Sequence, residues 1–128
     1  MHRNYETADA CSGKVIGAAI EVHRVLGPGL LESIYEKCLS RELELRGIPA
    51  VNQRKVSVEY KGLVFEESLR FDIVEVKAIE GVLPIHKAIA MSYMKLLDAP
   101  IGLIINFHEA KLVDGVNRLF LPGANRDA

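Results

Sequence analysis

The sequence predicts a single α/β domain, because helical and strand-like apolar spacings alternate along its 128 residues. We find no linker, internal repeat or low-complexity stretch, so one domain over 1–128 is expected. The order of the elements reads α-α-β-β-(β)-α-β-β. Apolar residues make up 49% and charged residues 26% of the chain, as in an ordinary globular protein with a buried core.

Two amphipathic helices open the chain. Thr7 or Asp9 can cap the first, which should run to about Leu26, because its apolar residues recur at three- and four-residue steps. The sequence Gly27-Pro28-Gly29 then breaks the helix, since proline cannot continue it. A second helix fits residues 31–46, and the glycine that follows is a natural C-terminal cap.

Strands and one further helix make up the rest. Val56, Val58 and Tyr60 alternate with polar residues, which predicts a half-buried strand over 51–60. The segment 63–77 is again strand-like, as one piece or two. The other expected elements are a helix from about Pro84 to Leu97 with Ile85, Ile89, Tyr93 and Leu96 on one face, a strand over 101–107 covered on both faces, a short strand over 116–121 and a flexible tail over 122–128.

Charge and cysteine content limit the function classes. The 16 basic and 17 acidic residues give a net charge of -1. This balance argues against a dedicated nucleic-acid coat protein, because phosphate binding depends on lysine and arginine. It does not exclude a local basic groove. The isolated Cys11 and Cys38 form neither a disulfide framework nor a metal knuckle, so we expect a reducing, cytoplasmic location. The sequence contains no long uncharged apolar run, so no membrane-spanning segment is expected.

The segment Asp72-Ile73-Val74-Glu75-Val76-Lys77 carries the candidate chemistry. Residues two apart on a strand share a face, so Glu75 and Lys77 should emerge side by side. Phosphodiester hydrolysis uses a metal to neutralise the phosphate and orient water, and Mg²⁺ prefers carboxylate oxygens. A nearby ammonium can stabilise developing charge. The alternative is a solvated, salt-bridging strand, which is common for so short a pattern.

Four stretches in order carry a family resemblance. Gly29–Tyr35 reads G-x-x-E-x-x-Y, Arg70–Asp72 reads R-x-D, and Glu75–Ala78 reads E-x-K-A. His86-Lys87-Ala88 then opens the third helix, and Leu103–Phe107 follows. Together they resemble the GxxExxY protein family, which is grouped with the PD-(D/E)XK nuclease-like superfamily. The resemblance covers most of the chain.

This resemblance implies a restriction-endonuclease-like mixed sheet flanked by helices, and Mg²⁺-dependent cleavage of nucleic acid, DNA before RNA. Asp72 and Glu75 resemble the two metal-binding acids, and Lys77 resembles the catalytic lysine. Glu32 resembles the helix-borne acid that supports them. Alternatively, Glu32 complements the dipole of its own helix.

Three further residues are candidates for binding substrate, each with a structural alternative. Arg70 could contact phosphate or pair with a neighbouring glutamate. His86 could contact phosphate or cap its helix. Tyr35 is a weaker candidate, because an aromatic residue at this spacing also fits the core.

Two departures from the family pattern predict a weakened site. Only two residues separate Asp72 from Glu75, which puts the acids on opposite faces and about 10 Å apart along a regular strand. A shared metal needs both carboxylates within about 2.0–2.6 Å of the ion. Ile89 also stands where the family carries glutamine. A second hypothesis is therefore a catalytically inactive nucleic-acid-binding or protein-assembly module, including a homodimer paired through an exposed sheet edge.

Overall fold

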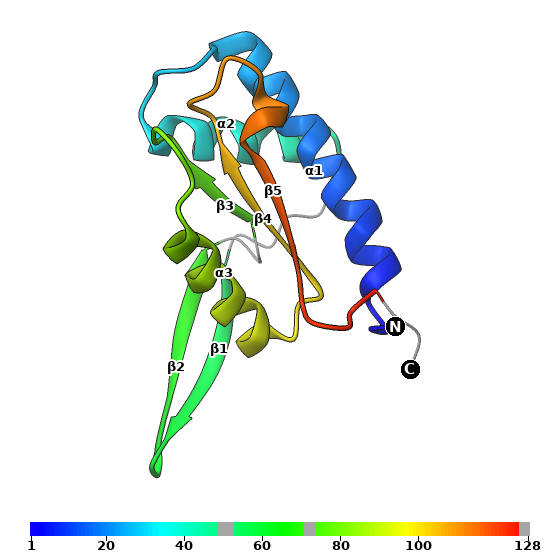
Figure 1. Ribbon diagram of the computed structural model, residues 1–128, viewed down its shortest axis with the longest axis vertical. Helices are drawn as coiled ribbons and strands as arrows, with labels where there is room; N and C mark the ends of the chain where they lie inside the picture. Colours follow the sequence, from blue (N-terminus) through cyan, green and yellow to red (C-terminus); the bar gives the residue numbers. More distant parts are fainter. Residues whose placement is uncertain (49–52, 71–73, 126–128) are drawn as a thin grey trace.

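The protein packs two helices on one face of a small mixed sheet and a third helix on the other (Figure 1). The structure is a computed structural model that describes residues 1–48, 53–70 and 74–125, with the backbone alone at 53–56 and 67–70. Its described elements are α1 (Tyr5–Leu26), α2 (Glu32–Leu45), β1 (Gln53–Tyr60), β2 (Leu63–Arg70), β3 (Val74–Lys77), α3 (Pro84–Leu97), β4 (Ile101–Asn106), a 3₁₀ turn η1 (Leu112–Gly115) and β5 (Val116–Phe120).

The strands form two separate sheets. β3 runs parallel to β4, and β4 runs antiparallel to β5, so the body of the protein holds a mixed three-stranded sheet in the order β3-β4-β5. β1 and β2 pair antiparallel as a hairpin that projects away from this body (Figure 1). The architecture confirms the predicted α/β, restriction-endonuclease-like class and the predicted element order. The strand-like segment 63–77 contributes to both sheets, through β2 and β3.

The central strand β4 is buried along its whole length, as its apolar sequence predicts. Leu103, Ile105 and the following Phe107 point into the main core with α1 and α2. Gly102 points the other way, toward Met94 of α3, where an added Cβ would lie 2.6 Å from the sulfur. Alternate residues of β4 thus point to opposite faces of the sheet. One face packs against α1 and α2, and the other packs against α3.

The first helix begins earlier than its capping residues predict. α1 starts at Tyr5, after Asn4, whose side chain makes no capping hydrogen bond. Asp9 is therefore not a cap, and it pairs instead with Arg118 of β5. The Tyr5 ring lies 6.2 Å from the ring of Phe120. These contacts with β5 hold the first turn of the helix, and local sequence cannot reveal them.

The C-terminal segment is anchored in its described part. The backbone carbonyl of Ala124 accepts a hydrogen bond of 2.8 Å from the N–H of His2, and Ala124 is buried. Residues 126–128 lie outside the described residues, so the flexible tail stays a prediction there. Among the helices that the structure describes, none combines the length and the apolar character needed to cross a membrane.

Substitutions at two glycines, Gly115 and Gly13, test how tightly the end of η1 packs against β4. A Cβ at Gly115 would lie 2.1 Å from the backbone oxygen of Asn106, which cannot move aside without breaking β4. We expect Gly115→Ala to lower the free energy of unfolding by about 1–3 kcal/mol, the usual cost of overpacking. Gly13 in α1 has open space around it, so Gly13→Ala should raise stability by about 0.5–1 kcal/mol. Urea denaturation of both variants measures the difference, and equal effects would contradict the packing.

Candidate functional site

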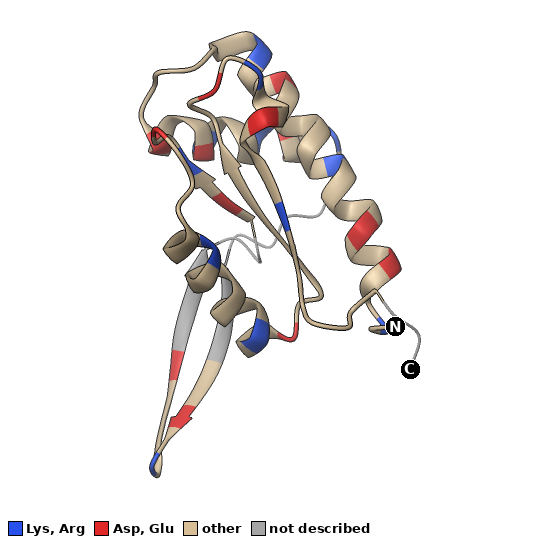
Figure 2. Cartoon of the chain, viewed as in Figure 1, with Lys and Arg blue, Asp and Glu red and all other residues tan. Residues whose placement is uncertain are grey.

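Glu75 and Lys77 lie on β3, close to the carboxyl end of the strand. The Lys77 Nζ atom is 3.0 Å from Glu75 Oε1, and their side chains are 21% and 37% exposed, respectively. Figure 2 shows the acidic and basic positions following each other along β3. The predicted shared face of these two residues is therefore present, with an ion pair that solvent can reach.

The register of the sheet shows which face this is. Glu75 lies opposite Ile104 and Lys77 opposite Asn106, whereas Val76 between them points into the core with α1 and α2. The acid and the lysine thus project from the face on which α3 packs over β4. A substrate for this pair would approach from the α3 side of the sheet.

Glu32 is brought to the same end of the sheet by α2. Tyr35, one turn later, stacks on Phe107 with ring centroids 4.5 Å apart. The backbone N–H of Phe107 donates a 2.9 Å hydrogen bond to the carbonyl of Lys77. The first turn of α2 is therefore next to the carboxyl ends of β3 and β4. Glu32 is half-buried there, and within the described part of the chain its carboxylate has no ion pair or hydrogen bond.

Tyr35 is fully buried, and its hydroxyl has two backbone partners. It donates to the carbonyl of Gly27 at 2.5 Å and accepts from the N–H of Leu30 at 3.1 Å. These bonds fix the loop that joins α1 to α2. This placement agrees with the core alternative for Tyr35 and leaves no surface of the ring for substrate.

His86 caps α3. Its Nδ1 atom accepts a 2.9 Å hydrogen bond from the backbone N–H of Leu83, one residue before the helix, and Pro84 takes the first helical position. This agrees with the capping alternative. Because Nδ1 accepts, the ring proton sits on Nε2, which is left to donate to an anion.

The structure describes no side chain for two of the predicted site residues. Asp72 lies outside the described residues, so its distance from Glu75 stays a prediction. Arg70 ends β2 opposite Gln53, and its side chain is not described. Ile89, on α3, is described and is 45% exposed.

The donor set suits a weakly held, hard cation. Among the described residues, no three acidic, histidine or cysteine side chains gather closely enough to hold a metal ion. Mg²⁺, however, commonly takes only one or two carboxylates and fills its remaining positions with water and substrate oxygens. Glu75, whose side chain is partly exposed on the α3 side of the sheet, fits that pattern.

Asn106 positions this end of the sheet, and the sequence analysis gave it no role. Its side chain is 1% exposed. The amide nitrogen donates to the carbonyl of Ile79 at 2.8 Å, and the amide oxygen accepts from the N–H groups of Ile79 at 3.1 Å and His108 at 3.2 Å. Asn106 thus clamps the chain directly after Lys77. The sequence signal for this role is that Asn106 is the polar residue at the end of an otherwise apolar, buried strand.

In comparison with known proteins, a family model described as the PD-(D/E)XK nuclease superfamily matches residues 9–119. The chain belongs to this superfamily. The match begins within α1 and ends within β5, so it includes Glu32, Glu75 and Lys77 as well as the clamp at Asn106. No curated protein and no solved structure matches the chain. The narrower resemblance to the GxxExxY family stays a prediction.

The clamp of this PD-(D/E)XK protein can be tested by removing one side chain. Asn106→Ala leaves three backbone groups at Ile79 and His108 without their partner. Each unsatisfied buried group costs about 1–3 kcal/mol, so we expect at least that loss in the free energy of unfolding. Asn117→Ala is the control, because that side chain donates one 3.2 Å bond and is half-buried. Chemical denaturation measures both, and a similar small loss in each would argue against the clamp.

Proposed function

We propose that this PD-(D/E)XK protein hydrolyses phosphodiester bonds of nucleic acid, DNA in the first instance, at the carboxyl end of β3. The observation that supports it is the solvent-accessible Glu75–Lys77 pair, 3.0 Å apart, on the α3 side of the sheet. Glu32, without an ion partner among the described residues, is held by α2 at the same end of the sheet.

Each residue would have a separate task. The Lys77 ammonium, with three N–H donors, bonds Glu75 through one of them. Its remaining donors can hold an attacking water or a non-bridging phosphate oxygen and stabilise the charge that develops there. The Glu32 carboxylate can accept a hydrogen bond from that water and orient it. The Nε2–H of His86 is a further donor for phosphate.

Glu75, together with Asp72, would hold Mg²⁺. When bound, the ion would neutralise charge on the phosphate and lower the pKa of a bound water. Glu75 would supply a carboxylate oxygen to the ion, and Lys77, which bonds Glu75 through one of its three N–H groups, would keep the others for the substrate.

Lysine substitution tests the proposal. With purified protein, Mg²⁺ and plasmid or single-stranded DNA, Lys77→Ala should reduce cleavage by about 10²-fold or more, the usual effect of removing one transition-state donor. Lys14→Ala is the matched control, because Lys14 is an exposed lysine of α1, on the other side of the sheet, without an ion pair among the described residues. Equal activity of wild type and Lys77→Ala would show that the site does not carry the reaction.

A second candidate is an inactive nucleic-acid-binding or assembly module of the same fold. Ile89 favours it, since an exposed apolar residue cannot bond phosphate or water. Titration calorimetry separates the two candidates. Binding of Mg²⁺ or Mn²⁺ that disappears in Glu75→Gln but persists in the distant Glu6→Gln supports the nuclease. No binding up to millimolar metal, with no cleavage, supports the module.

A further inference from the structure

The buried side chain of Tyr35 connects three elements of the fold. Its hydroxyl donates to the carbonyl of Gly27, the residue after α1, at 2.5 Å, and accepts from the N–H of Leu30, two residues before α2, at 3.1 Å. Its ring stacks on Phe107, the residue after β4, with an interplanar angle of 13°. Tyr35 is 0% exposed, so water does not compete for these contacts. One side chain thus ties the end of α1, the start of α2 and the end of β4 to one another.

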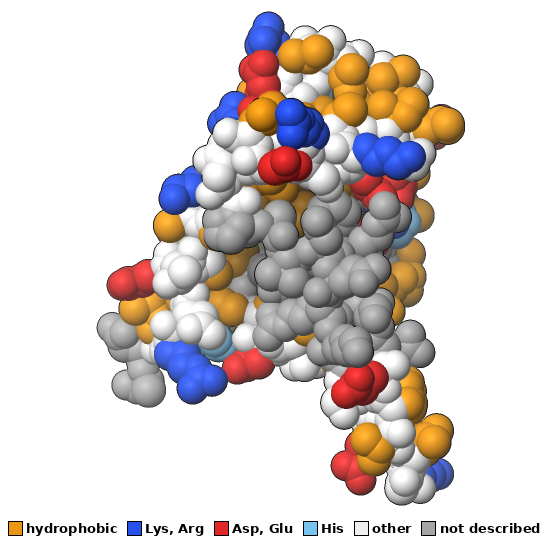
Figure 3. Space-filling model, turned by 180° about the vertical axis from the view of Figure 1, so that it is seen from behind, with side chains coloured by type: hydrophobic (Ala, Val, Ile, Leu, Met, Phe, Trp, Pro, Cys, Tyr) orange, Lys and Arg blue, Asp and Glu red, His pale blue; other side chains and the backbone are white. Residues whose placement is uncertain are grey.

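The first turn of α2 depends on this side chain for its attachment to the core. Leu31, at the N-cap, makes no capping hydrogen bond with its side chain. Leu31 is 71%, Leu30 38% and Ile34 37% exposed, so large parts of these apolar side chains lie on the surface. Figure 3 shows hydrophobic side chains exposed at the end of the molecule where α1 joins α2. Tyr35 is the first residue of α2 that the core buries.

The position of Glu32 follows from that attachment. Glu32 lies one turn before Tyr35, and residues three apart on a helix are neighbours on its surface. The burial of this turn agrees, because Glu32 is half-buried whereas Ser33 and Ile34 are exposed. The Glu32 carboxylate has no hydrogen bond or ion pair within the described part of the chain. It is therefore placed by its backbone, which Tyr35 holds.

The same contacts reach Lys77 on β3. The N–H of Phe107, on which the Tyr35 ring stacks, donates a 2.9 Å hydrogen bond to the carbonyl of Lys77. Two contacts therefore link Tyr35 to Lys77, the stacked rings and one backbone hydrogen bond. A shift of the Tyr35 side chain would move the first turn of α2, and Glu32 with it, relative to Lys77.

We propose that Tyr35 is a positioning residue, which holds the Glu32 carboxylate at a fixed place relative to Lys77. The inference rests on the proposed hydrolysis, in which Glu32 orients the attacking water and Lys77 stabilises the developing charge. A displacement of about 1 Å can cost about 10²-fold in rate, so a carboxylate without a partner of its own needs a rigid support. Tyr35 itself does not touch substrate, because it is buried.

A double-mutant cycle tests whether Tyr35 acts through Glu32. Tyr35→Phe removes the hydroxyl and keeps the stacked ring. With Mg²⁺ and single-stranded DNA, this change should lower kcat about tenfold or more and leave KM within about twofold, because it disturbs the transition state and not substrate binding. In a Glu32→Ala background, the same change should lower kcat by less than about twofold, because the carboxylate that Tyr35 positions is already absent.

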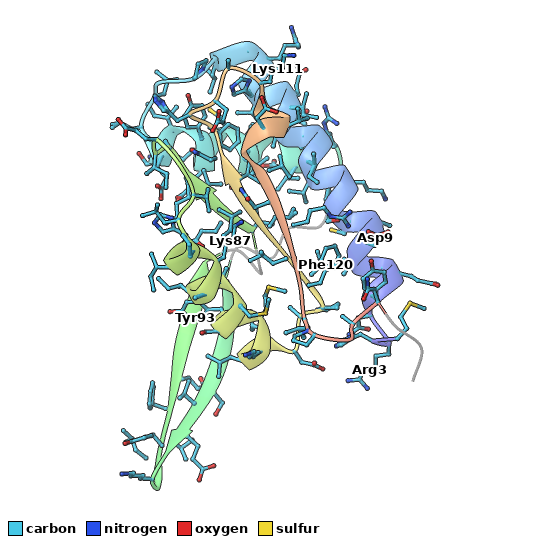
Figure 4. All side chains as sticks on the ribbon, in the orientation of Figure 1. Arg3, Asp9, Lys87, Tyr93, Lys111 and Phe120 are labelled. Carbon is cyan, nitrogen blue, oxygen red and sulfur yellow. The ribbon has the colours of Figure 1, made fainter. Side chains whose placement is uncertain are left out.

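Ser12→Ala is the matched control, because it also removes a buried hydroxyl. Ser12 is 5% exposed, and its hydroxyl donates to the carbonyl of Asp9 at 2.9 Å and accepts from Arg118 at 3.0 Å. Figure 4 shows Asp9 on α1 and Phe120 on β5, on the side of the molecule away from β3. Ser12→Ala should therefore keep kcat within about twofold of the wild-type value, and circular dichroism checks that every variant folds.

Hydrogen exchange measures the positioning without catalysis. The N–H of Ile34 closes the first turn of α2 on the carbonyl of Leu31 at 3.0 Å. At the amino end of β4, the N–H of Leu121 bonds the carbonyl of Pro100 at 3.0 Å. Tyr35→Phe should speed exchange at Ile34 about tenfold and leave Leu121 unchanged, because local opening exposes only the segment that opens. A general loss of stability would speed exchange at both.

Three results would each overturn the positioning role. They are full activity of Tyr35→Phe while Glu32→Ala and Lys77→Ala are impaired, equal losses of kcat from Tyr35→Phe with and without Glu32, and unchanged exchange at Ile34. The first of these leaves the proposed hydrolysis standing. Absence of cleavage by the wild-type protein would instead overturn the proposed hydrolysis together with this role.

Discussion

The parallel pairing of β3 with β4 is the constraint on which the rest of the structure depends. β3 is described over four residues, Val74–Lys77, and its far edge has no partner strand among the described residues. It is fixed by the ladder to β4, by the bond from Phe107 to the carbonyl of Lys77 and by the Asn106 clamp just beyond. Glu75 and Lys77 alternate with the core residue Val76, so any slip in register would bury the charges.

The sequence predicted those parts of the fold that follow from local periodicity. The apolar run 101–107 became a strand buried on both faces, and the Gly27-Pro28-Gly29 break separated two helices. The common face of Glu75 and Lys77 followed from the two-residue period of a strand. Long-range partners could not be predicted in this way. The Asn106 clamp links residues 27 positions apart, and the Asp9–Arg118 pair links residues 109 positions apart.

The third helix shows a different limit of periodicity. Its sequence is apolar around much of its circumference, and the spacing of Ile85, Ile89, Tyr93 and Leu96 defines one face without showing what that face meets. The structure buries Met94 and Leu97 instead, because the bare backbone at Gly102 lets Met94 approach β4 closely. The glycine in the strand therefore decides which side of the helix turns inward. The buried side of α3 could therefore be predicted only by considering α3 together with Gly102 of β4, and not from the sequence of the helix alone.

Ile89 marks a departure from the pattern that the GxxExxY resemblance predicts. That resemblance predicts a glutamine at this position, pointing at the site, and an isoleucine there can neither donate nor accept a hydrogen bond. Ile89 is 45% exposed on α3, and α3 packs on the face of the sheet from which Glu75 and Lys77 project. If α3 is to bond phosphate or water beside that pair, another of its residues has to do so. His86, three residues earlier on the same helix, offers an Nε2–H group, because its Nδ1 atom accepts from the backbone of Leu83.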